Sequence, residues 1–180
     1  MESVEYRKDG YVISTDPARL DLDVVHGYLA QSYWAENIPR AIVEKSVEHS
    51  LCFGVYEEAS GVQVGLARVV SDYATFAYLA DVFILEDYRG RGLSKWLMEC
   101  ILSHPELQLP RSFLLATRDA HGLYSRFGFA PLDAPEKYML RRNERVYRNR
   151  AYVVMTTIEN GGDMLDEGIE YDGQGDLQTS

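Results

Sequence analysis

The sequence predicts a single domain of the α/β class, built on a mixed α+β sheet. Three observations support this. Short apolar runs typical of strands alternate with segments of helical periodicity along the 180 residues. Three strand-like runs follow one another with short connections, which favours antiparallel pairing in the first half of the sheet. One longer helical segment then precedes the next strand, as a crossover between strands requires.

The first part of the chain predicts one strand and two helices. Residues 11–14 form a short strand-like run. Asp16 and Pro17 then supply an N-cap and a first-turn proline, so a helix is expected to begin there. Pro39 can open a second helix that runs to about Val47. An adjacent tyrosine and tryptophan, residues 33 and 34, therefore lie on or near the connection between the two helices.

Three strands and a helix are expected in the middle of the chain. The strand-like runs cover residues 51–56, 62–70 and 74–85, the last interrupted only by Asp81. The period then changes to that of a helix, which Pro105 ends. The apolar residues on one face of this helix are Leu93, Trp96, Leu97, Cys100 and Ile101.

One more strand and a short helix are expected next, followed by two strands. The strand covers residues 112–117, and Asp119 should cap a short helix that Gly128 closes. The runs 129–132 and 138–140 are expected to form two further strands around a turn. The predicted domain therefore spans residues 1–141.

The remaining residues divide into two segments of different composition. Residues 142–158 are basic at first and end in a strand-like run, Tyr152–Ile158, whose edge-like character suggests a homodimer formed through it. Residues 159–180 are acidic, contain glycine and lack a hydrophobic pattern, so they are expected to be disordered. Seven of the acids lie in this tail, which has no lysine or arginine and therefore accounts for most of the net charge of −10.

Composition argues against several classes of protein. The acidic balance argues against binding nucleic acid, and no apolar stretch approaches the ~20 residues of a membrane span. The N-terminus lacks the apolar run of a secretory signal, so a cytoplasmic location is expected. Cys52 and Cys100 are far apart in apolar surroundings and are expected to be buried, reduced thiols. The four histidines are scattered, so no metal site is expected.

The strongest chemical signal is the run Tyr-Arg-Gly-Arg-Gly-Leu-Ser at residues 88–94, between a buried strand and the central helix. Its two glycines allow a tight turn and a close approach of the backbone to a ligand. The N-terminus of the helix that follows offers unpaired amides and positive charge, which suit a pyrophosphate. A bare Gly-x-Gly is equally compatible with a simple tight turn.

This run resembles the Arg/Gln-x-x-Gly-x-Gly/Ala motif of the GNAT superfamily of acyl-CoA-dependent N-acetyltransferases, with Ser94 in place of the last small residue. A second segment, Leu-Tyr-Ser-Arg-Phe-Gly-Phe at residues 123–129, resembles the family's Leu-Tyr-x-x-x-Gly-Phe element. The resemblance covers roughly residues 10–141 and points to a small bacterial-type branch with unassigned substrates. It implies the GNAT fold, in which one parallel pair of strands splays apart beside the central helix.

The resemblance also implies a binding mode for acetyl-CoA, the expected co-substrate. Backbone groups of Val82, Phe83 and Ile84 should pair with the pantetheine arm, and Asp119 and His121 should lie where the family contacts CoA. The pyrophosphate should be wrapped by the amides of Arg89, Gly90, Arg91, Gly92, Leu93 and Ser94.

Two residues are expected to be catalytic. Tyr124 matches the family tyrosine that protonates the departing thiolate; a core tyrosine is the alternative from the residues alone. Asp81 stands in an otherwise apolar strand, so it is either paired structurally or accepts the proton of the attacking amine. His121 has a suitable intrinsic pKa for the same task.

Four residues are expected to bind the acceptor. Asp72 and Tyr73 could hold an ammonium group, and Tyr33 and Trp34 could line the pocket, where the indole would hold a cation over its ring. Aromatic packing is the plain alternative for the last two. The expected reaction is transfer of an acetyl group to a primary amine of a small molecule by direct attack in a ternary complex. A protein or peptide acceptor and a non-catalytic acyl-CoA sensor are the alternatives.

Overall fold

The structure is a computed structural model that describes residues 2–143 and residue 147. Six strands form one sheet in the order β1-β2-β3-β4-β5-β6. All neighbours are antiparallel except β5 and β6, which run parallel on either side of the crossover through the central helix, α3. The strands are β1 (Glu5–Lys8), β2 (Tyr11–Ser14), β3 (Leu51–Glu57), β4 (Gln63–Ser71), β5 (Phe76–Ile84) and β6 (Ser112–Leu115). The predicted fold class is therefore confirmed.

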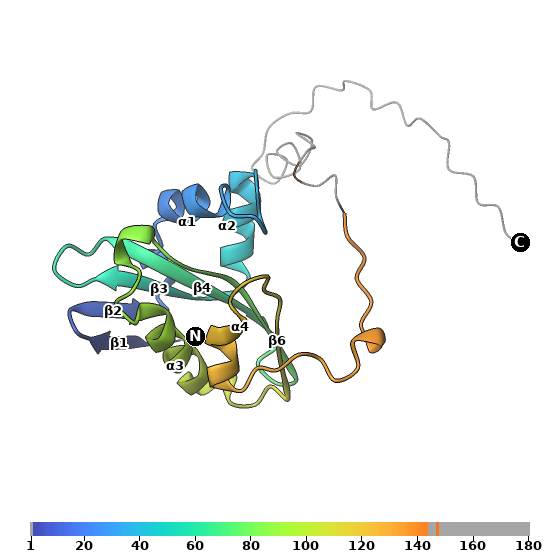
Figure 1. Ribbon diagram of the computed structural model, residues 1–180. Helices are drawn as coiled ribbons and strands as arrows, with labels where there is room; N and C mark the ends of the chain where they lie inside the picture. The colour runs from blue at the N-terminus through green and yellow to red at the C-terminus, as the bar shows by residue number, and fades with distance from the viewer. Residues whose placement is uncertain (1, 144–146, 148–180) are drawn as a thin grey trace, which may run out of the picture.

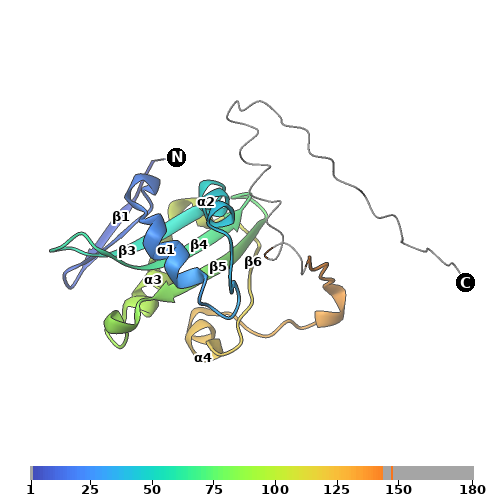
Figure 2. The ribbon, with the colours of Figure 1, turned by 90° about the horizontal axis from the view of Figure 1, so that it is seen from above.

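The helices cover both faces of the sheet (Figures 1 and 2). Helices α1 (Leu22–Leu29) and α2 (Arg40–Glu48) lie on one face, and α3 (Leu93–Ser103) and the short α4 (His121–Tyr124) lie on the other. Each face has its own apolar core, because alternate side chains of a strand point to opposite sides. The core under α1 and α2 includes Val25, Leu29, Val43, Leu66 and Phe83. The core under α3 includes Phe53, Val69, Trp96, Leu97 and Ile101.

The two cysteines are divided between these cores. Cys52 packs in the α1–α2 core and Cys100 in the α3 core, and both are free thiols. Burial raises the pKa of each thiol to about 12. The prediction of buried, reduced cysteines is confirmed.

The starts of two helices differ from the sequence prediction. Asp16 caps only a 3₁₀ turn, Pro17–Arg19, and α1 begins later, where the side chain of Asp21 accepts from the amides of Asp23 and Val24. Asp119 does not cap α4; the amide of Ala120 instead donates to the hydroxyl of Thr117. In both cases several residues that favour N-caps stand close together, so composition alone did not locate the cap. Helix α2 begins at Pro39 as expected, and Gly128 ends the α4 turn with a φ of 84°.

The predicted strands at residues 129–132 and 138–140 are absent. Neither run has a neighbouring strand in the described structure, and without a partner an extended segment gains no ladder of hydrogen bonds. Conversely, β1 was missed because its sequence Glu-Tyr-Arg-Lys is mostly charged and exposed. Charges of this kind are typical of an edge strand.

The extra strand expected at Tyr152–Ile158 and the acidic tail lie outside the described residues. No helix in the described part of the chain is long and apolar enough to cross a membrane.

Candidate active site

The site begins where the two parallel strands part. The last paired residues of β5 and β6 are Leu79 and Leu115. Beyond this point β5 continues to Ile84, whereas the chain after β6 turns away toward α4. The edge of β5 from Ala80 onward therefore has no strand beside it within the described residues, and a slot opens between the two chains.

A bulge in β5 coincides with this opening. The register between β4 and β5 shifts between Leu66 and Arg68, and opposite this shift Asp81 has a φ of 52°. A left-handed conformation is unusual for a residue with a side chain and is found at bulges and functional sites. The bulge takes Asp81 out of the regular alternation of the strand.

A hollow of about 850 Å³ occupies the opening. Its floor and walls come from β5, the end of β6, the loop before α4 and the connection between α1 and α2. The lining residues that the argument uses are Tyr33, Trp34, Arg68, Asp81, Val82, Thr117, Arg118, Asp119, Tyr124 and Arg142. A volume of this size is within the usual range for a small-molecule site.

Both oxygens of the Asp81 carboxylate accept hydrogen bonds. The guanidinium of Arg68 donates to Oδ2 at 2.7 Å, and the indole of Trp34 donates to Oδ1 at 3.2 Å. The Arg68–Asp81 ion pair is largely buried, with side-chain exposures of 16% and 11%. Arg68 also donates to the hydroxyl of Ser50 at 3.0 Å. Each carboxylate oxygen has a second lone pair, so Asp81 can still accept a hydrogen bond from a ligand.

Tyr33 and Arg118 close one side of the hollow. The guanidinium of Arg118 lies 3.7 Å from the centre of the Tyr33 ring, and its backbone amide donates to the Tyr33 hydroxyl at 3.2 Å. Trp34 meets Tyr33 edge-on, with 4.9 Å between ring centres. Both aromatic side chains remain more than one-third exposed, so they form an entrance rather than part of the core.

Tyr124 lies on the inner wall. It is 8% exposed, and none of the described residues shares a hydrogen bond with its hydroxyl. Burial, with smaller contributions from Tyr33 and Asp119, raises its pKa to about 12. The phenol is therefore protonated at neutral pH and can donate a proton or a hydrogen bond.

The glycine loop precedes α3. Gly90 and Gly92 have φ values of 77° and 79°, and no atom lies within 4 Å of where a Cβ would stand on either residue. Among the described residues, no group accepts a hydrogen bond from the backbone amides of Gly90 to Ser94. These amides and the positive end of α3 together fit a pyrophosphate.

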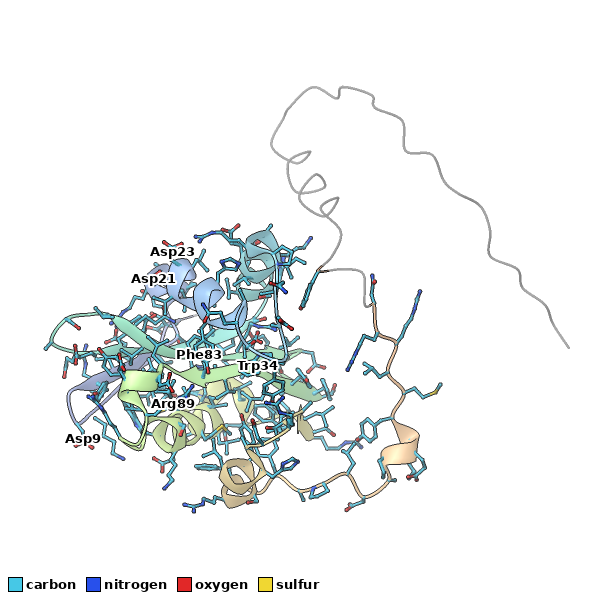
Figure 3. The ribbon with its side chains drawn as sticks, turned by 45° about the horizontal axis from the view of Figure 1, so that its top comes forward. Asp9, Asp21, Asp23, Trp34, Phe83 and Arg89 are labelled. Carbon is cyan, nitrogen blue, oxygen red and sulfur yellow. The ribbon has the colours of Figure 1, made fainter. Side chains whose placement is uncertain are left out.

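The side chains of the two loop arginines form hydrogen bonds that fix this turn. Arg89 donates to the carbonyl of Ile84 at 3.2 Å and to the hydroxyl of Tyr28 at 3.2 Å. Arg91 donates to the hydroxyl of Tyr11 at 2.7 Å. The ring of Tyr28 stacks on Phe83 at 3.9 Å and lies 6.2 Å from Trp34. Figure 3 shows Arg89, Phe83 and Trp34 near one another in the middle of the molecule, and contacts through Tyr28 link the loop to the edge of the hollow.

Other expected site residues lie elsewhere. The carboxylate of Asp72 accepts from the amides of Ala74, Thr75 and Phe76 and from the Thr75 hydroxyl, so it organises the turn before β5. These hydrogen bonds lower its pKa. Tyr73 packs against the α3 core. Neither residue lines the hollow.

The residues expected to contact the cofactor are divided between two regions. Val82 and Asp119 line the hollow, whereas the side chains of Phe83 and Ile84 are buried in the cores. His121 lines a different, apolar hollow on the other side of β6. The structure also brings in Arg68, Arg118 and Arg142, which were not expected. The sequence offered no local signal for Arg68 and Arg118, because the residues that they contact, Asp81 and Tyr33, are distant along the chain.

Comparison with known proteins places this geometry in a family. Residues 48–131 match the model of the acetyltransferase (GNAT) domain. A Gibberella zeae protein whose name assigns it to the acetyltransferases is 31% identical over 138 residues, which cover 64% of this chain and 77% of that protein. A crystal structure of a Xanthomonas campestris protein assigned to the GNAT family is 50% identical, with a TM-score of 0.73 over 77% of this chain and 97% of that one.

A more distant likeness concerns the co-substrate. A GNAT-family acetyltransferase from Elizabethkingia anophelis, solved with acetyl-CoA bound, has a TM-score of 0.55 at 11% identity, over 77% of this chain and 92% of that one. This likeness shows a shared fold. Together with the closer relatives, the splayed strands and the glycine loop, the comparisons establish that the chain belongs to the GNAT acetyltransferase family. It is an acetyl-CoA-dependent acyltransferase.

Proposed function

We propose that the protein is an N-acetyltransferase that moves the acetyl group of acetyl-CoA to a primary amine of a small molecule. The observation that carries this proposal is the hollow at the parting of β5 and β6, which holds a paired carboxylate and a phenol with no hydrogen-bond partner among the described residues. Its volume of about 850 Å³ accommodates the end of a pantetheine arm and a small acceptor. In this proposal the two substrates bind together and the amine attacks the thioester directly.

The glycine loop and β5 hold acetyl-CoA. The amides from Gly90 to Ser94, for which no acceptor lies among the described residues, bind the pyrophosphate. The edge of β5 that faces β6, at Val82, Phe83 and Ile84, has no strand beside it in the described part of the chain and pairs with the pantetheine amides as an added strand would. The Ile84 carbonyl already accepts from Arg89 and has a second lone pair for this contact. A strand amide near Val82 or Phe83 then points at the thioester carbonyl and stabilises the negative charge that develops on its oxygen. This arrangement places the thioester in the hollow.

Tyr124 supplies the proton to the leaving group. A thiolate has an ordinary pKa of about 8.5, and the pKa of Tyr124 is raised to about 12. The phenol therefore stays protonated through the neutral range and can donate as the carbon–sulfur bond breaks. Its hydroxyl, which has no hydrogen-bond partner in the described part of the chain, lies in the wall of the hollow and supports this role.

Asp81 acts on the acceptor. An amine attacks only when it is neutral, so the bound ammonium must lose a proton. The carboxylate is positioned in the hollow by Arg68 and Trp34, and its remaining lone pairs can take up that proton directly or through a water. Trp34 and Tyr33 stand at the entrance, where the exposed indole of Trp34 can hold a cation over its ring; the ring of Tyr33 already carries the guanidinium of Arg118.

The charges of the hollow indicate which acceptors it would bind. Arg68 is paired with Asp81, and Arg118 lies 3.6 Å from Asp119. Arg142 lines the hollow and forms no ion pair among the described residues. An acceptor that carries a carboxylate as well as its amine would satisfy this charge.

The test is release of CoA thiol from acetyl-CoA in the presence of amino acids, simple amines, polyamines and aminoglycosides. We expect turnover with at least one free amine and none with peptides blocked at all but one lysine. Turnover with peptides alone would assign a protein acceptor instead. Binding of acetyl-CoA in calorimetry with no turnover on any acceptor would favour the sensor.

A further inference from the structure

The hollow at the parting of β5 and β6 carries an excess of positive charge. Among the described residues, three arginines and two aspartates line it. Arg68 is paired with Asp81, and Arg118 lies 3.6 Å from Asp119. The third arginine, Arg142, has no acidic partner within the described residues. An anionic group on a ligand would therefore balance this charge.

The end of acetyl-CoA that enters the hollow does not supply this anion. In the proposed function the pyrophosphate binds at the glycine loop, and the thioester and the pantetheine amides are uncharged. The anionic group therefore comes from the acceptor. An amino acid fits, because its reacting form has a neutral amine beside a carboxylate. Polyamines and aminoglycosides keep further positive charges in their reacting forms, and the hollow repels these charges.

The chain beyond α4 returns to the neighbourhood of Asp81. Arg142 and Tyr147 both belong to this part of the chain, and both line the hollow. Burial raises the pKa of Tyr147, and the nearby carboxylate of Asp81 raises it further. The guanidinium of Arg142 is carried on a long, flexible side chain a few residues earlier. One hollow therefore contains a carboxylate for an amine and a guanidinium for a carboxylate.

The part of the hollow away from the thioester is aromatic. Tyr78 and Tyr147 line it. Tyr78 points to the face of α1 and α2, because its neighbours Ala77 and Leu79 are buried in the core under α3. Within the described residues, neither tyrosine ring stacks on another aromatic ring. Both rings are therefore available to pack against an aromatic ligand.

Apolar surface continues past Tyr78 on the same face of the sheet. Val70 is the partner of Tyr78 in β4, and Phe76 lies two residues before Tyr78 in β5. These two side chains are 40% and 42% exposed. The three residues of strand from Tyr78 to Asp81 span about 10 Å. An aromatic amino acid whose amine lies at Asp81 can cover this distance together with the side chain of Tyr78.

We propose that the acceptor is an aromatic amino acid. Its amine lies at Asp81, its carboxylate binds Arg142, and its ring packs against Tyr78 and Tyr147. This inference rests on the proposed function, because it names the acceptor of that reaction.

The product is the N-acetyl amino acid and free CoA. One proton of the ammonium passes to Asp81 and on to solvent, and the neutral amine attacks the thioester carbon. The new carbon–nitrogen bond forms as the carbon–sulfur bond breaks, and Tyr124 donates its proton to the sulfur. The proton that the nitrogen loses as the amide forms replaces the one that Tyr124 gave. The carboxylate stays ionised throughout, so Arg142 holds both substrate and product.

The first test compares acceptors that differ by one group, by release of CoA thiol with the full chain. Phenylalanine has an amine, a carboxylate and a ring; phenethylamine lacks the carboxylate, and alanine lacks the ring. We expect kcat/KM for phenylalanine to exceed both other values about 10-fold or more, because each missing group leaves part of the hollow unfilled or unpaired. A value for phenethylamine or alanine that matches it, or turnover confined to other amines, would overturn the inference and leave the proposed function standing. Turnover with no free amine at all would end both.

The second test assigns the carboxylate to Arg142. Arg142→Gln should raise the KM for phenylalanine about 10-fold, since it removes a hydrogen bond between charged groups. The KM for phenethylamine should not change, and its turnover also shows that the variant is folded. Arg141→Gln removes the same charge one residue away, outside the lining of the hollow, and should leave both KM values unchanged. An equal rise for both acceptors in Arg142→Gln, or no rise for phenylalanine, would refute the inference.

Discussion

The hollows on the two sides of β6 share one wall and have opposite chemistry. Leu115, Ala116, Thr117 and Tyr124 contribute to both. The hollow toward β5 adds three arginines and two aspartates of the described chain, whereas the hollow on the outer side adds mainly phenylalanine, leucine and proline, with His121 and Ser125 as its polar members. The former suits a polar reaction, and the latter offers mainly apolar contacts.

The two hollows also differ in how the chain builds them. Apart from Leu102, the apolar groove is formed by residues 113–132, which are neighbours in sequence. The polar hollow joins Tyr33, Arg68, Asp81 and Arg118 from four separate parts of the chain. Chemistry in this protein therefore depends on long-range contacts.

The largest expected effect is the loss of kcat when the hydroxyl of Tyr124 is removed. Replacing Tyr124 by Phe keeps the ring that packs edge-on against Phe129 and removes only the hydroxyl. We expect kcat to fall about 100-fold, in the range of general acid catalysis, with little change in acetyl-CoA affinity. Steady-state kinetics and calorimetry measure both.

Tyr6→Phe, in β1 at the opposite edge of the sheet, is the matched control and should keep kcat. Because the pKa of Tyr124 is raised to about 12, its ionisation should not lower kcat as the pH rises through 10, the ordinary tyrosine value. An unchanged kcat in Tyr124→Phe would remove the tyrosine from the mechanism.

The next effect concerns Asp81. The Asp81→Asn variant keeps a carbonyl oxygen for Trp34 but cannot take up a proton, so kcat should fall on the order of 10-fold or more. Asp119→Asn, the other aspartate of the hollow, should keep kcat because its side chain is 62% exposed. Thermal unfolding of both variants decides whether Asp81 is a proton acceptor or only a structural partner of Arg68. A lower Tm with unchanged kcat would make the Arg68–Asp81 pair purely structural.

A smaller effect is expected at the glycine loop. In Gly92→Ala no atom would clash with the new Cβ, but the φ of 79° becomes strained at a cost of about 1–2 kcal/mol. A shift of the loop amides should raise the KM for acetyl-CoA about 10-fold. Gly10→Ala carries the same strain at a φ of 78° in the β1–β2 turn, and it should lower Tm alone. Equal KM values in the two variants would argue against pyrophosphate binding by this loop.

The smallest kinetic effect is expected at Asp72. The carboxylate organises the turn before β5, so Asp72→Ala should lower Tm and leave the KM for the amine unchanged. The lowered pKa of this group means that its contribution is present above its ordinary value of 3.8 and is lost as the pH falls further. The Tm difference from wild type should accordingly shrink in acid. A raised KM for the amine would restore Asp72 to the acceptor site.

Local signals in the sequence account for the parts that were predicted. The order of elements from β2 to α4 follows from periodicity, and the glycine loop follows from a motif in the correct context. The pairing of Arg68 with Asp81 could not be predicted, since it depends on a register shift between β4 and β5. The run at residues 138–140 has the composition of a strand, but a strand exists only with a neighbour, and none of the described residues supplies one.

The burial of both cysteines has a practical consequence. Thiolates, not thiols, react with electrophiles and oxidants, and at a pKa of about 12 neither Cys52 nor Cys100 forms one near neutral pH. The folded enzyme should therefore withstand air without added reductant. Thiol reagents used to follow turnover will then report the released CoA, with no background from the protein itself.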